Sequence, residues 1–112
     1  MPETTIGLFP DVGATHILAR MPQHVGMYLG LTGLPIGAGG AIAYGLADYY
    51  VPDASVPELV KALSENPGDV AEVVAQFPQD KPSAELTDDA SWIAECFAKD
   101  SPQEIVEALR SH

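Results

Sequence analysis

The sequence has one cysteine, Cys96, among its 112 residues, so no disulfide can form within the chain. A structural zinc site built from several cysteines is excluded for the same reason, and we expect no metal site. Positive charge is also scarce, because five lysines and arginines stand against sixteen aspartates and glutamates. Phosphate binding depends on clustered Lys and Arg, so we expect neither nucleic acid nor a membrane surface as a partner.

Long apolar runs and targeting signals are missing as well. No apolar stretch approaches the roughly 20 residues that a transmembrane helix needs. The first residues include Glu3 and no basic segment, which does not fit a secretory signal peptide. Pro2 and residues that could carry chemistry follow Met1 directly, as they would in a segment taken from a longer protein. We therefore expect the chain to be a fragment.

Hydrophobic residues make up 46% of the chain, which is typical of a folded globular segment. The acidic residues concentrate from Asp48 onward, and only Glu3 and Asp11 precede that position. We treat residues 1–112 as one unit that has two parts. Residues 1–52 are rich in Gly and Pro, and residues 53–112 form an acidic segment with helical periodicity.

Helix start and stop signals divide the first part. Asp11 is placed to cap a helix that ends before Pro22, and Pro22 can open a second helix that ends at Gly33. Residues 37–40, Gly-Ala-Gly-Gly, match no phosphate-binding fingerprint and are expected to form a loop that leads into a helix. Residues 48–51, Asp-Tyr-Tyr-Val, are the best strand candidate because they are aromatic and β-branched.

The second part predicts several amphipathic helices. Ser55 and Ser101 each begin a capping-box pattern with proline at the first helical position, and Asp69 is a third candidate N-cap. Residues 78–82 are expected to form a linker, and Cys96 falls on an apolar stripe that favours a core thiol over a nucleophile. The whole pattern predicts a mostly α structure with one or two short strands.

Glu3 and Asp11 are the candidate functional residues, because both carboxylates lie in apolar, Gly-rich surroundings. Paired acids in different environments can divide base or nucleophilic work from hydrogen bonding. Each residue also has a structural interpretation. Asp11 fits an N-cap, and Glu3 fits a solvated acid near the end of the chain.

The segment Pro2-Glu3-x-x-x-Gly7-x-x-Pro10 resembles the part of crotonase-superfamily enzymes that carries an active-site glutamate. Enoyl-CoA hydratases typically have a Gly-rich run after that proline, whereas Asp11 follows it here, as in 3-hydroxyisobutyryl-CoA hydrolases. The similarity continues through residues 28–33 and 45–48 and more loosely through residues 96–97 and 104–109. It implies part of a crotonase-like α/β fold, with the active-site segment in residues 1–52.

The resemblance also implies a function. Glu3 would be the catalytic and substrate-binding carboxylate of a thioester hydrolase in valine degradation, and Asp11 would hydrogen-bond the substrate's 3-hydroxyl group. The substrate is an acyl-CoA, no separate cofactor is expected, and the protein would be cytoplasmic, or mitochondrial in a eukaryote. The loops that supply the family's oxyanion donors and bind most of the CoA phosphates precede this segment. We therefore expect the isolated chain to be inactive.

Two other interpretations stay open. An enoyl-CoA hydratase or isomerase would keep Glu3 but would give Asp11 no hydroxyl to bind. A non-catalytic helical module would associate with itself, because amphipathic helices without their usual partners expose apolar faces that favour a homo-oligomer.

Overall fold

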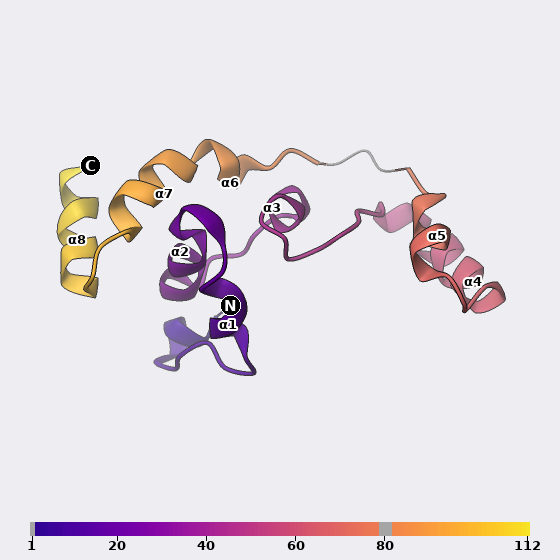
Figure 1. The fold of residues 1–112 in the computed structure, drawn as a ribbon, viewed down its shortest axis with the longest axis horizontal. Helices are drawn as coiled ribbons and strands as arrows, with labels where there is room; N and C mark the ends of the chain where they lie inside the picture. The colour runs from indigo at the N-terminus through magenta and orange to yellow at the C-terminus, as the bar shows by residue number, and fades with distance from the viewer. Residues whose placement is uncertain (1, 79–81) are drawn as a thin grey trace.

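The computed structural model describes residues 2–78 and 82–112, and within these ranges the chain is an elongated assembly of short helices (Figure 1). Its principal extents are 54 × 28 × 21 Å. The helices of the first part are the 3-10 helix η1 (Glu3–Ile6), α1 (Ala14–Leu18), the 3-10 helix η2 (Pro22–His24), α2 (Val25–Thr32) and α3 (Ala38–Ala43). Those of the second part are the 3-10 helix η3 (Asp53–Ser55), α4 (Val56–Glu65), α5 (Val70–Ala75), α6 (Glu85–Asp88), α7 (Ala90–Phe97) and α8 (Pro102–Ser111).

The described residues contain no β-strand, so the predicted strand at residues 48–51 and the expected part of an α/β fold are wrong for this chain. Residues 48–51 instead form an irregular connection between α3 and η3. A strand is stable only when its backbone N–H and C=O groups pair with a neighbouring strand. No neighbouring strand lies in the described part of the chain, so β propensity alone does not produce one.

The core lies where α2 packs against α7. Val25 of α2 and Ile93 of α7 are fully buried. The ring of Tyr28 meets the rings of Trp92 and Phe97 edge-on, at centroid distances of 5.8 and 5.4 Å. Edge-to-face contacts place the positive rim of one ring on the negative face of another, so these three aromatics fix the crossing of the two helices.

A glycine allows α1 and α2 to approach closely. A Cβ atom built on Gly26 would overlap the backbone carbonyl group of Leu18, which cannot move aside as a flexible side chain would. Gly33 ends α2 in the left-handed conformation, with φ of 68°, and its N–H donates to the carbonyl of Leu29. The predicted end of this helix at Gly33 is therefore confirmed.

The Gly-rich residues 37–40 were expected to form a loop, but α3 begins at Ala38 and includes Gly39 and Gly40. Packing explains the difference, because a Cβ on Gly39 would overlap the backbone carbonyls of Pro82 and Ser83. Tyr44, at the end of α3, is buried, and its hydroxyl donates to the carbonyl of Leu86 over 3.4 Å. The segment that leads into α6 therefore packs directly on α3.

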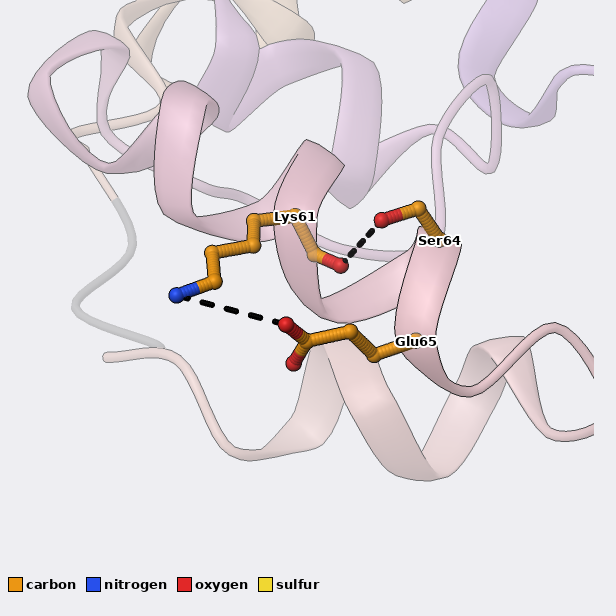
Figure 2. Close-up of polar contacts among 3 residues, drawn as sticks. All are labelled: Lys61, Ser64 and Glu65. Atoms are coloured by element: carbon orange, nitrogen blue, oxygen red, sulfur yellow. Dashed lines mark hydrogen bonds and ion pairs between the residues drawn. The ribbon is translucent and has the colours of Figure 1, made fainter.

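The pair α4–α5, together with η3 which leads into α4, lies apart from the other helices, at the far end of the long axis (Figure 1). No residue of α4 is buried, and the residues that α5 buries, Val73 and Val74, lie outside the main core. Figure 2 shows the polar contacts on the surface of α4. Ser64 Oγ donates to the carbonyl of Lys61 over 2.6 Å, and Lys61 Nζ lies 4.0 Å from Glu65 Oε1. Both partners of this ion pair are well exposed, so it contributes little to stability.

Two of the three predicted caps in the second part are confirmed. Asp69 Oδ1 accepts from the N–H of Glu72, and Ser101 Oγ accepts from the N–H of Glu104. Ser55 precedes α4 as predicted, but its side chain makes no capping hydrogen bond. The central residues of the expected linker, 79–81, lie outside the described residues. In the described part of the chain, none of the helices has the length and apolar character needed to cross a bilayer.

Candidate functional site

Glu3 is held by η1, a short 3-10 helix at the start of the chain that packs against α2. Gly7 ends η1 in the left-handed conformation, with φ of 80°, which glycine adopts without steric cost. The N–H of Leu8 then donates to the carbonyl of Glu3 over 2.8 Å. This local hydrogen bonding fixes the backbone of the glutamate before the chain passes through residues 8–10 into the turn that begins at Asp11.

The Glu3 side chain is partly buried, and its Oε2 atom is covered by the protein. The adjacent Thr4 is also partly buried, with its Oγ1 atom covered. Neither atom has a hydrogen-bond partner among the described residues. Buried polar atoms are paired in the great majority of cases, so two unpaired atoms on neighbouring residues mark an unusual place in the molecule.

The wall of an apolar pocket of about 580 Å³ includes Thr4, the residue that follows this glutamate in the sequence. Its wall starts at Thr4, continues through Leu8, Phe9 and Pro10, and is completed by residues of α1, η2 and α2. Thr4, Thr15 and His24 are the only residues with polar side chains among those that line it. The two predicted site residues flank this wall in sequence, since Glu3 precedes Thr4 and Asp11 follows Pro10.

Asp11 is exposed in the turn before α1, and its predicted role as an N-cap is wrong. The helix begins instead from Gly13, which has φ of 81°, and no side chain caps it. Asp11 contributes only its backbone carbonyl, which accepts from the N–H of Ala14 over 2.9 Å. Because the side chain has no part in starting the helix, N-capping does not account for the presence of an acidic residue at this position.

The structure therefore places Glu3 on η1 and Asp11 in the turn before α1, and of these two residues only Glu3 is partly buried. The interpretation of Glu3 as a fully solvated acid does not hold, because one of its carboxylate oxygens is covered. Sequence reasoning missed Thr4 and Phe9, which line the pocket between them. A hydroxyl directly after a glutamate in an apolar segment was the signal available for Thr4.

No cluster of three or more metal-ligating side chains occurs within residues 2–78 and 82–112. The perturbed tyrosines belong to the core and not to the pocket. Burial, with a smaller contribution from the negative charge of Asp89, raises the pKa of the Tyr28 phenol. Burial alone raises the pKa of Tyr44. These shifts reflect packing. Thr4, Thr15 and His24 supply the polar side chains of the pocket wall, and the carboxylates of Glu3 and Asp11 belong to residues that adjoin part of this wall in the sequence.

Comparison with known proteins identifies the family to which this chain belongs. The chain belongs to the enoyl-CoA hydratase/isomerase family, whose model matches residues 1–112. This confirms the resemblance to the crotonase superfamily that the motif around Glu3 indicated.

Several curated relatives carry the name that the acid after Pro10 suggested. A probable 3-hydroxyisobutyryl-CoA hydrolase of Arabidopsis thaliana is 38% identical over 97% of this chain and 30% of its own length. The mitochondrial 3-hydroxyisobutyryl-CoA hydrolase of Xenopus tropicalis is 36% identical over 98% of this chain and 31% of its own length. The chain thus spans about 30% of the length of these relatives.

Two further similarities widen the range of functions. The crystal structure of a carnitinyl-CoA dehydratase from Mycobacterium thermoresistibile matches all of this chain and 32% of its own, with a TM-score of 0.92 and 39% identity. The small ribosomal subunit protein mS47 of Schizosaccharomyces pombe is 33% identical over all of this chain and 28% of its own length. Similarity over this segment is therefore shared by hydrolases, a dehydratase and a ribosomal protein.

Proposed function

We propose that residues 1–112 are the active-site segment of an acyl-CoA thioester hydrolase that resembles the 3-hydroxyisobutyryl-CoA hydrolases and acts in valine degradation. The observation that carries this proposal is the partly buried Glu3 on η1, which has a covered Oε2 atom. In the sequence it directly precedes Thr4, the first residue of the pocket wall. The names of the hydrolase relatives support the same reaction class.

Glu3 is the catalytic carboxylate in this proposal, either as a nucleophile or as a base toward water. A carboxylate on a fixed turn of helix can stay at attack distance from a thioester, and such positioning contributes strongly to rate. The apolar pocket would accept the short acyl chain and exclude bulk water from the reacting carbon. CoA is part of the substrate, and no separate cofactor is needed for hydrolysis.

Asp11 binds the 3-hydroxyl group of the substrate in this proposal. Its side chain does not cap α1, so the carboxylate can accept a hydrogen bond from a ligand. A negatively charged acceptor makes a stronger hydrogen bond than a neutral one, which suits the selection of a hydroxylated acyl group.

The remaining parts of the reaction site would come from polypeptide outside residues 1–112. Thioester cleavage needs N–H donors at the carbonyl oxygen, where negative charge develops during attack. CoA phosphates also need cations, and the chain has five Lys and Arg residues in all. We therefore expect the isolated chain to hydrolyse little or no acyl-CoA.

The test compares hydrolysis of 3-hydroxyisobutyryl-CoA by the full-length protein that contains this segment and by its Glu3→Gln variant. Gln has nearly the same shape as Glu but can act neither as a base nor as a nucleophile. We expect kcat to fall roughly 10²- to 10⁴-fold, the usual contribution of a positioned acid or base. Release of free CoA thiol measures the rate.

Glu58→Gln is a matched control, because Glu58 is exposed on α4, away from the pocket. This variant should keep the parent kcat and the parent melting temperature. Undiminished turnover by Glu3→Gln would remove Glu3 from the mechanism and with it the proposed function.

A second candidate is a hydratase or dehydratase of the same family, favoured by the close match to the carnitinyl-CoA dehydratase structure. Assays of crotonyl-CoA hydration and of 3-hydroxyacyl-CoA hydrolysis on one preparation distinguish the two. A non-catalytic role is a third candidate, since mS47 is a ribosomal protein. Absence of both activities in the full-length protein would favour that role.

The protein would work in the cytoplasm, or in the mitochondrion if the organism is a eukaryote. The Xenopus tropicalis relative is named as mitochondrial, which supports the second location. The acidic composition, with a formal net charge of −11, argues against nucleic acid as a partner.

A further inference from the structure

The two unpaired buried atoms at the start of the chain have complementary hydrogen-bonding properties. Glu3 Oε2 belongs to an acceptor when the carboxylate is ionised, whereas the Thr4 hydroxyl can both donate and accept. Both residues lie on the four-residue helix η1, which packs on α2. Leaving either group buried without a partner costs roughly 1–3 kcal/mol, and more for a charged group.

A small polar ligand within hydrogen-bond reach of both groups would satisfy both atoms at once. The carboxylate needs a donor, and the hydroxyl needs either a donor or an acceptor. Water offers two donors and two acceptor positions, and buried waters typically make two to four hydrogen bonds. Water also fits the surroundings, because the adjacent pocket is almost entirely apolar and offers a larger polar ligand few other partners.

We propose that Thr4 is a positioning residue that holds the water consumed by thioester hydrolysis beside the Glu3 carboxylate. This inference rests on the proposed function, because it assigns the second substrate of that reaction to the same site. The water oxygen becomes part of the released carboxylic acid as the carbon–sulfur bond breaks. CoA leaves as the thiol and takes up one proton from the water, so atoms and charge balance.

A rotation of the Thr4 side chain would give the water access. Thr4 forms part of the pocket wall, although its hydroxyl oxygen is covered. The hydroxyl and methyl groups of threonine are similar in size, and staggered rotamers exchange their positions about the Cα–Cβ bond. Turning the hydroxyl toward the pocket would therefore expose a polar group on an otherwise apolar surface, at the residue that follows Glu3.

The experiment uses the full-length protein and compares Thr4→Val, which keeps the shape but loses the hydroxyl, with Thr4→Ser, which keeps the hydroxyl but loses the methyl. Rates are measured with 3-hydroxyisobutyryl-CoA in water and with added hydroxylamine, a nucleophile that competes with water. The free acid and the hydroxamate are quantified separately.

We expect Thr4→Val to lower kcat for hydrolysis roughly 2- to 12-fold, with little change in KM, because one water-positioning hydrogen bond is lost. The hydroxamate share should rise, while Thr4→Ser should keep the parent kcat and product ratio. Thr5→Val is the matched control, since Thr5 lies on the same helix η1 but is exposed and does not line the pocket. It should leave both quantities unchanged.

A role in packing alone predicts the opposite pattern, in which Thr4→Val behaves like the parent and Thr4→Ser is impaired. That result would overturn the inference. If Thr4→Val does not fold, Thr4→Ala compared with Thr4→Ser provides the same contrast. The Glu3→Gln variant distinguishes failure of this inference from failure of the proposed function. If Glu3→Gln is inactive and Thr4→Val has normal kcat, only the role of Thr4 in holding water is contradicted. If Glu3→Gln is active, the proposed function itself is contradicted.

Discussion

Glu3 and Asp11 differ in what surrounds their side chains. Glu3 is partly buried with one oxygen covered, whereas Asp11 is exposed in a turn and does not cap the helix that follows. This asymmetry fits a division of work, in which one acid acts at the reacting carbon and the other contacts a more distant polar group. The sequence alone suggested both residues but could not separate their environments, because burial depends on packing against α2.

The role proposed for Asp11 leads to a substrate-dependent prediction. In the full-length protein, Asp11→Ala should lower kcat/KM for 3-hydroxyisobutyryl-CoA by roughly 10- to 150-fold, the value of a hydrogen bond to a charged group. Isobutyryl-CoA lacks the hydroxyl, so its kcat/KM should stay the same. Steady-state kinetics with both thioesters measure the difference.

Asp53→Ala is a suitable control, because Asp53 is exposed on η3, away from the pocket. The melting temperature of Asp11→Ala should equal that of the parent, since no cap is lost. Equal losses with both thioesters would contradict a hydroxyl-binding role.

At the scale of helices, local chemistry predicted several boundaries. Gly33, Asp69 and Ser101 mark helix ends or starts as expected, because a left-handed glycine or a short acceptor side chain acts within one turn. Residues 48–51 and the Gly-rich residues 37–40 were misjudged for a different reason. Strand pairing and the close packing of Gly39 on residues 82–83 depend on contacts distant in sequence.

The crossing of α1 and α2 provides a test of such a distant contact. Gly26→Ala should destabilise the protein by about 1–3 kcal/mol, because the new methyl would overlap the Leu18 carbonyl. The loss should appear even though alanine has the better intrinsic helix propensity. Urea denaturation followed by circular dichroism measures the free energy of unfolding.

The matched control is Gly68→Ala, because a Cβ at Gly68 meets no atom within 4 Å. This variant should be as stable as the parent or slightly more so, since alanine restricts the unfolded chain. A Gly26→Ala protein as stable as the control would show that the α1–α2 crossing can relax without cost.

At the scale of the whole molecule, the shape was not predictable from local patterns. The distance of α4 and α5 from the core depends on the connection between α3 and α4, residues 44–55, which has no periodic hydrophobic pattern. The exposure of apolar side chains also depends on how all the helices are arranged. Phe9 is 73% exposed and Val12 is 95% exposed, although both belong to the segment beside the pocket.

Such exposure predicts self-association of the 112-residue chain, because exposed apolar side chains favour contacts between copies. The mean mass measured by light scattering should rise with protein concentration. Phe9→Asp should weaken this rise, since it puts a charge into the exposed apolar segment. Gln103→Asp on α8 is the control for charge alone, because Gln103 is exposed and polar and its replacement removes no apolar side chain. A constant monomer mass at every concentration would contradict the prediction.

The position of Cys96 has a consequence for the redox behaviour of any such assembly. Its side chain is 1% exposed, within the core that α7 shares with α2 and α8. A thiolate must reach an oxidant or another sulfur before a bond can form. Copies that meet through their outer surfaces therefore cannot be covalently joined while the fold is intact. A disulfide-linked dimer would therefore indicate that α7 had separated from α2 and α8 before the disulfide formed.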